Sequence, residues 1–359
     1  MLVILGPRQA GKTTLLQDYL GGCSDRYRLE SGDNLQTQHI LGTADINRLQ
    51  EYVQGYDLLV VDEAQKIANI GVCLKILVDH VPGIKIIVTG SSAFELAGQV
   101  GEPLTGRKTT LTLFTIAQLE LLNIYNAAEL KEKLPEWLVY GAYPEVITTP
   151  SKNDKRQLIS EIAHSYLLKD ILELDNIKNS KILVDLLRLL ALQIGQEVSL
   201  SELGIQLGIN YKTVARYLDL LEKSFVIYSV CGFSRNLRKE IRKKNKYYFY
   251  DTGVRNAIIA NFNDLSMRND TGQLWENFLV IERIKKQSYQ QIYANNYFWR
   301  TWEGQEIDWV EEREGQLFGY EFKWGKNKAK APRVWFETYK NAQFKLINPD
   351  NYLEFITAI

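Results

Sequence analysis

A short glycine-rich segment near the N-terminus has the residue types that bind a phosphate chain. It consists of Gly6, Pro7, Arg8, Gln9, Ala10, Gly11, Lys12 and Thr13, and Thr14 follows it. Glycines let backbone N–H groups turn inward around phosphate oxygens, and a helix that begins here adds the partial positive charge of its N-terminus. Lys12 is expected to reach the β- and γ-phosphates and Thr13 to be a ligand of Mg²⁺. Against the alternative of an accidental glycine turn, the segment predicts a site for ATP with magnesium.

Two later apolar runs end in polar residues that suit the same chemistry. Asp62 and Glu63 follow residues 58–61, and Ser91 and Ser92 follow residues 84–88 with Thr89 and Gly90 between. Parallel α/β sheets bind ligands at the carboxyl ends of their strands. We expect Asp62 to hold the metal, Glu63 to act as the catalytic base, and Ser91 or Ser92 to sense the γ-phosphate. Acidic pairs after strands also serve as caps or solvated turns, which is the alternative interpretation.

A pair of carboxylates in the C-terminal third suggests a second site. Glu314 and Gly315 can form a two-residue turn, and a hairpin closed there places Asp308 opposite Glu321. Such carboxylates, about 5 Å apart, repel each other unless a cation or proton intervenes. A divalent metal between them could activate water against a phosphodiester, with Lys323 stabilising negative charge. Glu276, on a predicted helix at 274–280, could supply a third carboxylate. A surface hairpin with alternating charges would show the same residues.

The elements that must position the N-terminal candidates are those of an α/β fold. The apolar runs at 2–5, 58–61 and 84–88 predict buried strands of a parallel sheet, and residues 14–17 continue the phosphate-binding segment as a helix. We therefore predict a P-loop NTPase sheet, followed by a helical and winged-helix segment and an α/β nuclease-like domain. Turn and break residues at 140–145 and 148–151 set the predicted boundaries, giving domains at 1–150, 151–230 and 231–359.

A helix-turn-helix pattern lies in the middle of the chain. Ser199 and Glu202 have capping-box spacing, and Gly208 separates two helical runs. In the second run the apolar face contains Val214, Leu218 and Leu221, and the outward positions are Tyr211, Lys212 and Arg216. Wing strands are expected at 225–228 and 247–250, around a basic loop with Arg235, Arg238, Lys239, Arg242, Lys243, Lys244 and Lys246. The module either binds DNA through this helix and loop or serves packing and oligomerisation.

Composition restricts the classes of partner. The chain has 359 residues, and 43 basic side chains balance 43 acidic ones, so no overall field draws it to DNA or to an anionic membrane. Cys23, Cys73 and Cys231 have neither metal-ligand spacing nor a disulfide framework. No apolar run reaches the roughly 18 residues that a membrane span needs. We expect a cytoplasmic protein without a membrane partner.

The N-terminal motifs resemble the AAA-type branch of P-loop ATPases. The resemblance covers residues 1 to about 115, in the patterns GPRQxGKT, DEAQ and TGSS, with Gly106-Arg107 after the last of them. It implies that Arg107 contacts a γ-phosphate in its own or a neighbouring subunit of a homo-oligomer. A surface salt bridge is the alternative for this arginine. Members of this branch usually carry an upstream segment that helps to cover the adenine, whereas this chain begins directly at the P-loop strand.

The C-terminal residues resemble the PD-(D/E)XK nuclease signature, with Asp308 as the first acid, Glu321-Phe322-Lys323 as the E-x-K element and Glu276 as the helix carboxylate. The order of modules, with Tyr-Tyr-Phe-Tyr-Asp-Thr-Gly at 247–253, is similar to a large family of uncharacterised bacterial and archaeal ATPases. The resemblance implies a magnesium-dependent ATPase coupled to a nuclease-like domain that acts on nucleic acid. The alternative is a nucleotide-dependent binding switch, whose inactive nuclease-like domain recognises a partner.

Overall fold

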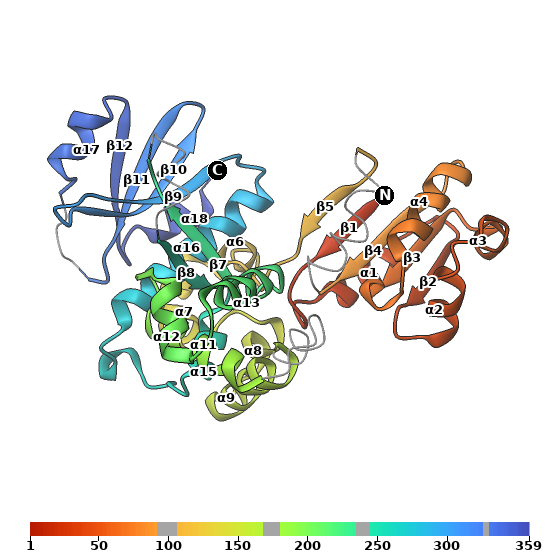
Figure 1. Ribbon diagram of the computed structural model, residues 1–359, viewed down its shortest axis with the longest axis horizontal. Coiled ribbons are helices and arrows are strands. Elements are labelled where there is room, and N and C mark those ends of the chain that lie inside the picture. Colours follow the sequence, from red (N-terminus) through yellow and green to blue (C-terminus); the bar gives the residue numbers. More distant parts are fainter. Residues whose placement is uncertain (92–105, 168–179, 235–243, 326–329, 359) are drawn as a thin grey trace. The chain divides into compact units, whose positions relative to one another are not determined.

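The structure is a computed structural model that describes residues 1–91, 106–167, 180–234, 244–325 and 330–358 (Figure 1). Its internal contacts divide the chain into two units. Unit 1 comprises Met1–Thr115 with Lys223–Phe225, and unit 2 comprises Ile116–Glu222 with Val226–Ile359. The first division therefore lies at residue 115 and not near the predicted residue 150.

Within the described part of unit 1, five strands form one parallel sheet in the order β2-β3-β4-β1-β5. The strands are β1 (Leu2–Leu5), β2 (Tyr27–Ser31), β3 (Leu58–Asp62), β4 (Lys85–Gly90) and β5 (Thr109–Thr112). The central strands are continuous apolar runs because both faces of a parallel sheet are covered. The predicted α/β class and the three predicted strands are confirmed.

Short helices connect these strands. They are α1 (Lys12–Gly21), α2 (Leu35–Leu41), α3 (Ile46–Val53) and α4 (Ile70–His80), with a 3-10 turn η1 (Ala64–Lys66). Asn34 and Asp45 cap α2 and α3, since each side chain accepts hydrogen bonds from two backbone N–H groups of the first turn. Leu16 and Leu20 of α1 pack on Ile4, Val60 and Ile87 of the sheet. This packing fixes the helix behind the glycine-rich segment.

Unit 2 is richer in helices. They are α6 (Gln118–Leu121), α7 (Ala127–Tyr140), α8 (Pro144–Thr148), α9 (Lys152–Glu161), the π-helix η2 (Ile162–Leu167), α11 (Ser180–Leu192), α12 (Leu200–Leu207), α13 (Tyr211–Lys223), α15 (Thr252–Ile258), the 3-10 turn η3 (Leu265–Met267), α16 (Thr271–Tyr289), α17 (Arg333–Thr338) and α18 (Tyr352–Thr357). Ser199 caps α12, and Gly208, at φ +66°, ends it. Both ends were predicted from the sequence.

One mixed sheet runs through the described residues of unit 2 in the order β12-β11-β10-β9-β7-β8-β6. Its strands are β6 (Glu197–Val198), β7 (Ile227–Gly232), β8 (Asn245–Phe249), β9 (Asn295–Arg300), β10 (Glu306–Arg313), β11 (Gln316–Phe322) and β12 (Ala342–Ile347). β7 pairs with β8 on one side and with β9 on the other. The predicted boundary at 231 thus falls inside a strand, and the expected wing strands belong to the same sheet as the expected nuclease-like hairpin.

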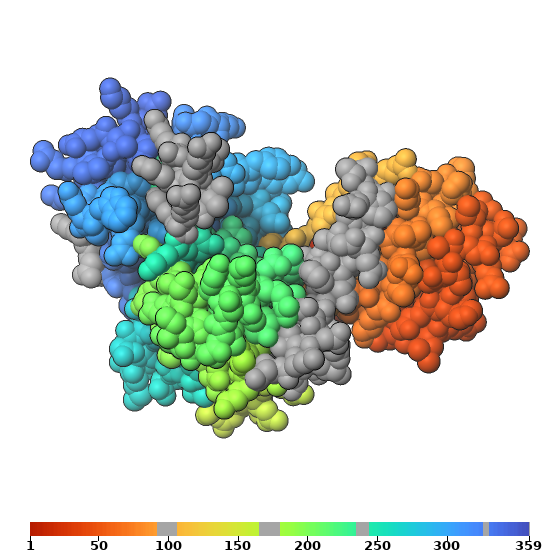
Figure 2. Space-filling model, viewed as in Figure 1, coloured from red at the N-terminus to blue at the C-terminus, as the bar shows by residue number. Residues whose placement is uncertain are grey.

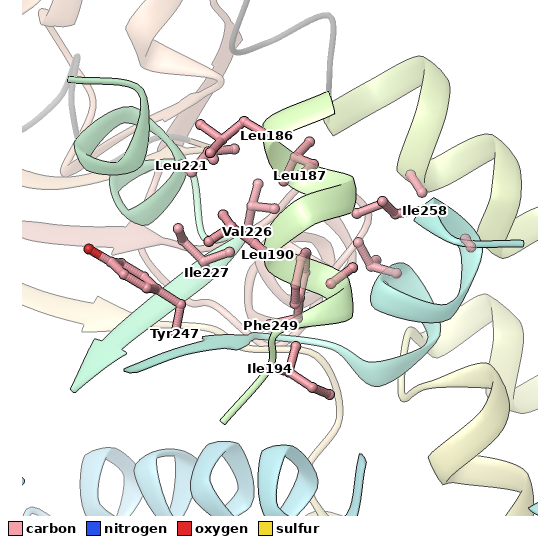
Figure 3. Close-up of a cluster of buried hydrophobic side chains, with 14 of the residues drawn as sticks. Leu186, Leu187, Leu190, Ile194, Leu221, Val226, Ile227, Tyr247, Phe249 and Ile258 are labelled. Atoms are coloured by element: carbon pink, nitrogen blue, oxygen red, sulfur yellow. The ribbon is translucent and has the colours of Figure 1, made fainter. Parts of the chain in front are cut away.

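The core of unit 2 explains why the predicted boundaries differ from the structure. Tyr247 and Phe249 face a cluster that contains Leu186, Leu187 and Leu190 of α11 (Figure 3). Residues of α7, among them Leu134 and Trp137, pack in a second cluster with residues of α16 and β11. These long-range apolar contacts bind residues 127–140 to the C-terminal part of the chain. Figure 2 shows the same view of the molecule in space-filling form.

In the part of the chain that the structure describes, no helix has both the length and the apolar character to cross a membrane. Among the described residues, Cys23, Cys73 and Cys231 form no disulfide.

Candidate functional site

The glycine-rich segment forms a tight loop between β1 and α1. The backbone of Gln9 and Gly11 has φ of +58° and +99°. At Gly6 a Cβ atom would lie 2.0 Å from the carbonyl oxygen of Leu113, so only glycine fits there. Lys12 begins α1, and its buried ammonium donates to the carbonyl oxygens of Gly6 and Pro7 at 2.9 and 2.8 Å. The loop therefore holds a cation at the start of a helix.

The ends of β3 and β4 bring the predicted magnesium-side residues together. Thr13 Oγ1 donates to Asp62 Oδ2 at 2.7 Å, although 49 positions separate them. The hydroxyl of Thr89 donates to Asp62 Oδ1, and the backbone N–H of Glu63 donates to Thr89 Oγ1 at 3.1 Å. Hydroxyl and carboxylate oxygens are ligands that Mg²⁺ prefers. The donor set of Thr13 and Asp62 therefore fits this ion.

Glu63 is held in an unusual backbone conformation next to this pair. Its φ is +52°, in the left-handed region that a non-glycine residue rarely adopts. Gln65 donates from Nε2 to Glu63 Oε2 at 2.6 Å and to Ser91 Oγ at 3.0 Å. Ser91 thus lies beside the predicted base, and Ser92 lies outside the described residues. The sequence prediction missed Thr89 and Gln65 as functional candidates, though both stand in the TGSS and DEAQ patterns.

Arg107 forms a salt bridge, which is the alternative that the sequence analysis gave for this residue. Its guanidinium forms an ion pair with Asp79 of α4, and about half of the side chain is exposed. The backbone carbonyl of Arg107 also accepts a hydrogen bond from the N-terminal amine of Met1 at 3.3 Å. The structure thus supplies this arginine with a partner in its own chain.

The C-terminal hairpin has the predicted register. Glu314 and Gly315 turn at φ +49° and +76°, and Trp309 pairs with Tyr320, so Asp308 and Glu321 extend the ladder by one step. The pairing of β10 with β9 shifts between Ile307 and Val310, however, which is a β-bulge. The bulge interrupts the regular alternation of side chains along β10, and Asp308 and its neighbours 307 and 309 are all buried.

Asp308 and Glu321 have oxygen atoms available to a cation. Asp308 Oδ2 accepts a hydrogen bond from the backbone N–H of Phe322 at 2.8 Å. Glu321 Oε2 is buried and has no hydrogen-bond partner in the described part of the chain, and its other oxygen lies 2.6 Å from the ammonium of Lys323. Burial, together with the charges of Glu276 and Glu321, raises the pKa of Asp308 well above its ordinary value. This is the behaviour of a carboxylate that lacks sufficient positive charge.

Glu276 lies close to these acids but has other partners. Its Oε1 accepts a hydrogen bond from the hydroxyl of Tyr248 at 2.7 Å and lies 3.4 Å from the ammonium of Lys246. Burial raises the pKa of Glu276 despite the opposing charge of Lys246. Among the described residues, no three His, Cys, Asp or Glu side chains are grouped so that they could hold a metal ion. The structure therefore does not assemble the three-carboxylate metal site predicted from Glu276, Asp308 and Glu321.

Lys246 requires a correction. It was predicted in the exposed basic loop, but it lies on β8 with 2% of its side chain exposed and forms an ion pair with Glu306. Although burial disfavours the charged form, the charges of Glu276, Glu306 and Asp308 raise the pKa of Lys246. The prediction failed because residues 246 and 248 face the acids, whereas 247 and 249 face the α11 cluster. Lys244 is exposed, and the loop residues Arg235, Arg238, Lys239, Arg242 and Lys243 lie outside the described residues.

Helix α13 presents the outward residues that were predicted. Val214, Leu218 and Leu221 are buried, whereas Tyr211, Lys212 and Arg216 are exposed. The hydrophobic pattern therefore assigned both faces of this helix correctly.

Comparison with known proteins agrees with the motifs of the N-terminal unit. Residues 1–122 match the family model described as an AAA domain. This match gives the chain an AAA-type P-loop domain at its N-terminus. Residues 131–265 and 271–347 match two domains of unknown function, DUF8612 and DUF4143. The first of these spans crosses both predicted domain boundaries.

Relatives occur in bacteria and archaea. An uncharacterized protein of Mycobacterium tuberculosis is 27% identical over 328 residues, covering 90% of this chain and 70% of its own. Another, from Haemophilus influenzae, is 28% identical, covering 79% of this chain and 74% of its own. The solved structure of a DNA replication initiation factor aligns with 62% of this chain and 81% of its own at 18% identity, with a TM-score of 0.26. A TM-score this low carries no conclusion about the fold.

Proposed function

We propose that the chain is a magnesium-dependent ATPase whose C-terminal unit acts on nucleic acid. The observation that carries the first part is the 2.7 Å hydrogen bond from Thr13 to Asp62, which joins the phosphate-binding loop to the end of β3. A P-loop hydroxyl and an acid at the end of another strand of the same sheet are the pair that holds Mg²⁺ in P-loop ATPases. The AAA-domain match over residues 1–122 supports the same assignment.

Each residue has a separate task in this proposal. Lys12 binds the β- and γ-phosphates, and Thr13 and Asp62 hold the metal. Magnesium, when bound, neutralises phosphate charge that would otherwise oppose attack by water. Glu63 accepts the proton of that water, and Thr89 keeps the Asp62 carboxylate in place. Ser91, hydrogen-bonded to Gln65 beside Glu63, senses the terminal phosphate.

Phosphate release by the full-length protein tests this assignment. Glu63→Gln should lower kcat by about 100-fold or more while ATP still binds, because general base catalysis contributes about that much. Lys12→Ala should abolish ATP binding in calorimetry. Glu51→Gln, an exposed glutamate of α3, is the matched control and should behave as wild type. Turnover that survives Glu63→Gln would remove Glu63 from the role of base.

For the second part we propose that α12, α13, β7 and β8 form a winged helix-turn-helix that contacts DNA. α13 exposes Tyr211, Lys212 and Arg216, and β7 and β8 follow as an antiparallel pair. Exposed basic side chains on a helix of this type contact phosphates or base edges in the major groove.

We also propose that Asp308, Glu321 and Lys323 form a nuclease-like site. The buried, unpaired oxygen of Glu321 beside Asp308 supports a bound cation. A divalent cation, when bound, would activate water and polarise the phosphodiester, and Lys323 would stabilise the negative charge. Cleavage of DNA or RNA with Mg²⁺ or Mn²⁺ should vanish in Asp308→Asn and in Lys323→Ala. Cleavage that persists in both would assign the activity to a contaminant.

A nucleotide-dependent binding switch is the second candidate. The hydrogen bond from Gln65 to Glu63 favours it, because a restrained base would slow hydrolysis while leaving ATP binding intact. Wild-type protein that binds ATP tightly but releases no phosphate would establish the switch.

We also propose that the protein is located in the cytoplasm. Because Arg107 pairs with Asp79, we assign it no role across subunits of a homo-oligomer.

A further inference from the structure

The acidic site of unit 2 contains a lysine that no motif assigned to it. Among the described side chains, four carboxylates lie near enough to influence one another's charge or that of this lysine, although no three of them are grouped closely enough to hold one metal ion; they are Glu276 on α16, Glu306 and Asp308 on β10, and Glu321 on β11. Lys323 neutralises Glu321 from the rim, where 38% of its side chain is exposed. Lys246 enters from β8 and is almost fully buried between Glu276 and Glu306.

We propose that Lys246 is a resident cation of this site, standing where a second metal ion would otherwise stand, so that the site binds one divalent cation at Asp308 and Glu321. The inference rests on the metal-binding role proposed above for these two residues. The inference specifies how many metal ions the site binds and names Lys246 as the residue that determines this number.

The charges support a single ion. When the four carboxylates are ionised, the two ammonium groups leave two negative charges, which one divalent cation cancels and two would exceed. Buried charges are stable only when they are paired. A buried lysine among carboxylates can take the place of a metal ion. Its ammonium group stays at one location because the aliphatic part of the side chain is packed in the fold. The stem of Lys246 is held in place by β8, which pairs with β7, and its ammonium lies 5.2 Å from the centre of the Phe298 ring.

The hydrogen bonds divide the site in the same way. Glu276 is bonded to Tyr248 and lies next to Lys246, so its near oxygen is occupied. On the other side, Glu321 Oε2 is buried and accepts no hydrogen bond from any residue that the structure describes. Two carboxylates are few, but Mg²⁺ commonly binds through one or two of them and keeps several waters. The absence of a three-acid group among the described residues is then expected, since Lys246 takes the place of the second ion.

Counting bound Mn²⁺ tests the proposal. Full-length protein without nucleotide is titrated with Mn²⁺, and free ion is measured by electron paramagnetic resonance. Wild type should bind one ion in unit 2, and Asp308→Asn should weaken it by at least about tenfold. Lys246→Met should bind a second ion and gain thermal stability from Mn²⁺ that wild type does not. Lys244→Met, an exposed lysine just before β8, is the matched control and should keep one ion.

Glu306→Gln supplies a second test if Lys246→Met does not fold. Under the proposal Glu306 is the partner of Lys246 and not a metal ligand, so this variant should still bind one Mn²⁺, less tightly only because one negative charge near the ion is lost. Complete loss of the ion would overturn the proposal, because Glu306 would then be a ligand. One ion in both wild type and folded Lys246→Met would also overturn it, while leaving the Asp308–Glu321 site intact. If no form binds Mn²⁺, the metal site under "Proposed function" itself is wrong.

Discussion

The side-chain amide of Gln65 joins two predicted functional residues, because its Nε2 lies 2.6 Å from Glu63 Oε2 and 3.0 Å from Ser91 Oγ. Gln65 Oε1 is buried and has no hydrogen-bond partner among the described residues. The amide therefore uses its donors to hold the proposed base next to the residue proposed to sense the γ-phosphate. This connection could link the nucleotide state to the position of Glu63.

Replacing Gln65 by leucine should lower kcat for ATP hydrolysis by about tenfold without changing the Kd for ATP. The reason is that the carboxylate of Glu63 loses the donor that orients it, and misplaced catalytic groups lose rate rather than binding. Steady-state phosphate release and calorimetry measure the two quantities. Gln50→Leu is the control, because Gln50 is exposed and its side-chain amide donates to the carbonyl of His80, away from the proposed site. A rise in kcat would mean that the amide restrains the base, as the switch alternative requires.

Lys212→Ala should weaken binding of double-stranded DNA and reduce the salt slope of log K by about 1, the change expected when one phosphate contact is lost. Fluorescence anisotropy at several salt concentrations measures the slope. Lys181→Ala is the matched control, since Lys181 is an exposed lysine at the start of α11. Equal slopes for the two variants would exclude α13 from the DNA interface.

The stability of unit 2 should depend on Asp270 at neutral pH but not in strong acid. Arg268 donates to both oxygens of Asp270, at 2.8 and 2.9 Å, and Arg255 forms a further ion pair with it. Although burial opposes the charge, these arginines lower the pKa of Asp270 to about 2. A lowered pKa stabilises the fold above the ordinary carboxyl value of 3.8, and this contribution is lost as pH falls through about 2.

Asp270→Asn should therefore cost about 1–2 kcal/mol at pH 7, a figure reduced for the partial exposure of the site. The difference from wild type should shrink between pH 4 and pH 2. Urea unfolding at a series of pH values measures it. The exposed Asp154 of α9 provides the control substitution, Asp154→Asn. A difference that stays constant with pH would contradict the ion-pair explanation.

Gly141→Ala should destabilise unit 2 more than Gly208→Ala. Both glycines have positive φ, +81° and +66°, but a Cβ at 141 would lie 2.0 Å from Asp251 Oδ1, whereas a Cβ at 208 meets nothing within 4 Å. Asp251 cannot withdraw easily, because its carboxylate accepts hydrogen bonds from the backbone of Ala142 and Val254 at 2.7 and 3.1 Å. We expect about 1 kcal/mol at Gly208 and about 2–3 kcal/mol more at Gly141. Equal losses in thermal unfolding would show that Asp251 moves aside.

Much of the N-terminal site could be predicted because its signals are local in sequence. The loop around Lys12 and the acids after β3 follow from strand and glycine patterns, and the parallel sheet then brings Thr13 to Asp62. The roles of Thr89 and Gln65 could not be predicted, since threonine and glutamine also occur in many turns that have no function in catalysis. Only the side-chain hydrogen bonds distinguish them from ordinary polar residues at a strand end.

Some features of the C-terminal site are determined by a local turn, and others are determined by packing against distant parts of the chain. The register of Asp308 and Glu321 was predictable because the turn at Glu314 and Gly315 determines the whole hairpin. The bulge at Asp308 and the inward direction of Lys246 were not, because they depend on strands far away in the chain. Both faces of β8 are buried, so alternation alone cannot say which of them meets the acids.

The junction of β7 and β9 decides how this protein can be dissected. A fragment that starts or stops at Cys231 would sever the ladder at Cys231 and Gly232, which pair with Tyr297 and Phe298. Each fragment would then expose an unpaired strand edge, which promotes aggregation with other molecules. A helical fragment prepared without the C-terminal strands would therefore precipitate for reasons unrelated to its ligand, and its failure to bind DNA would say nothing about the intact molecule.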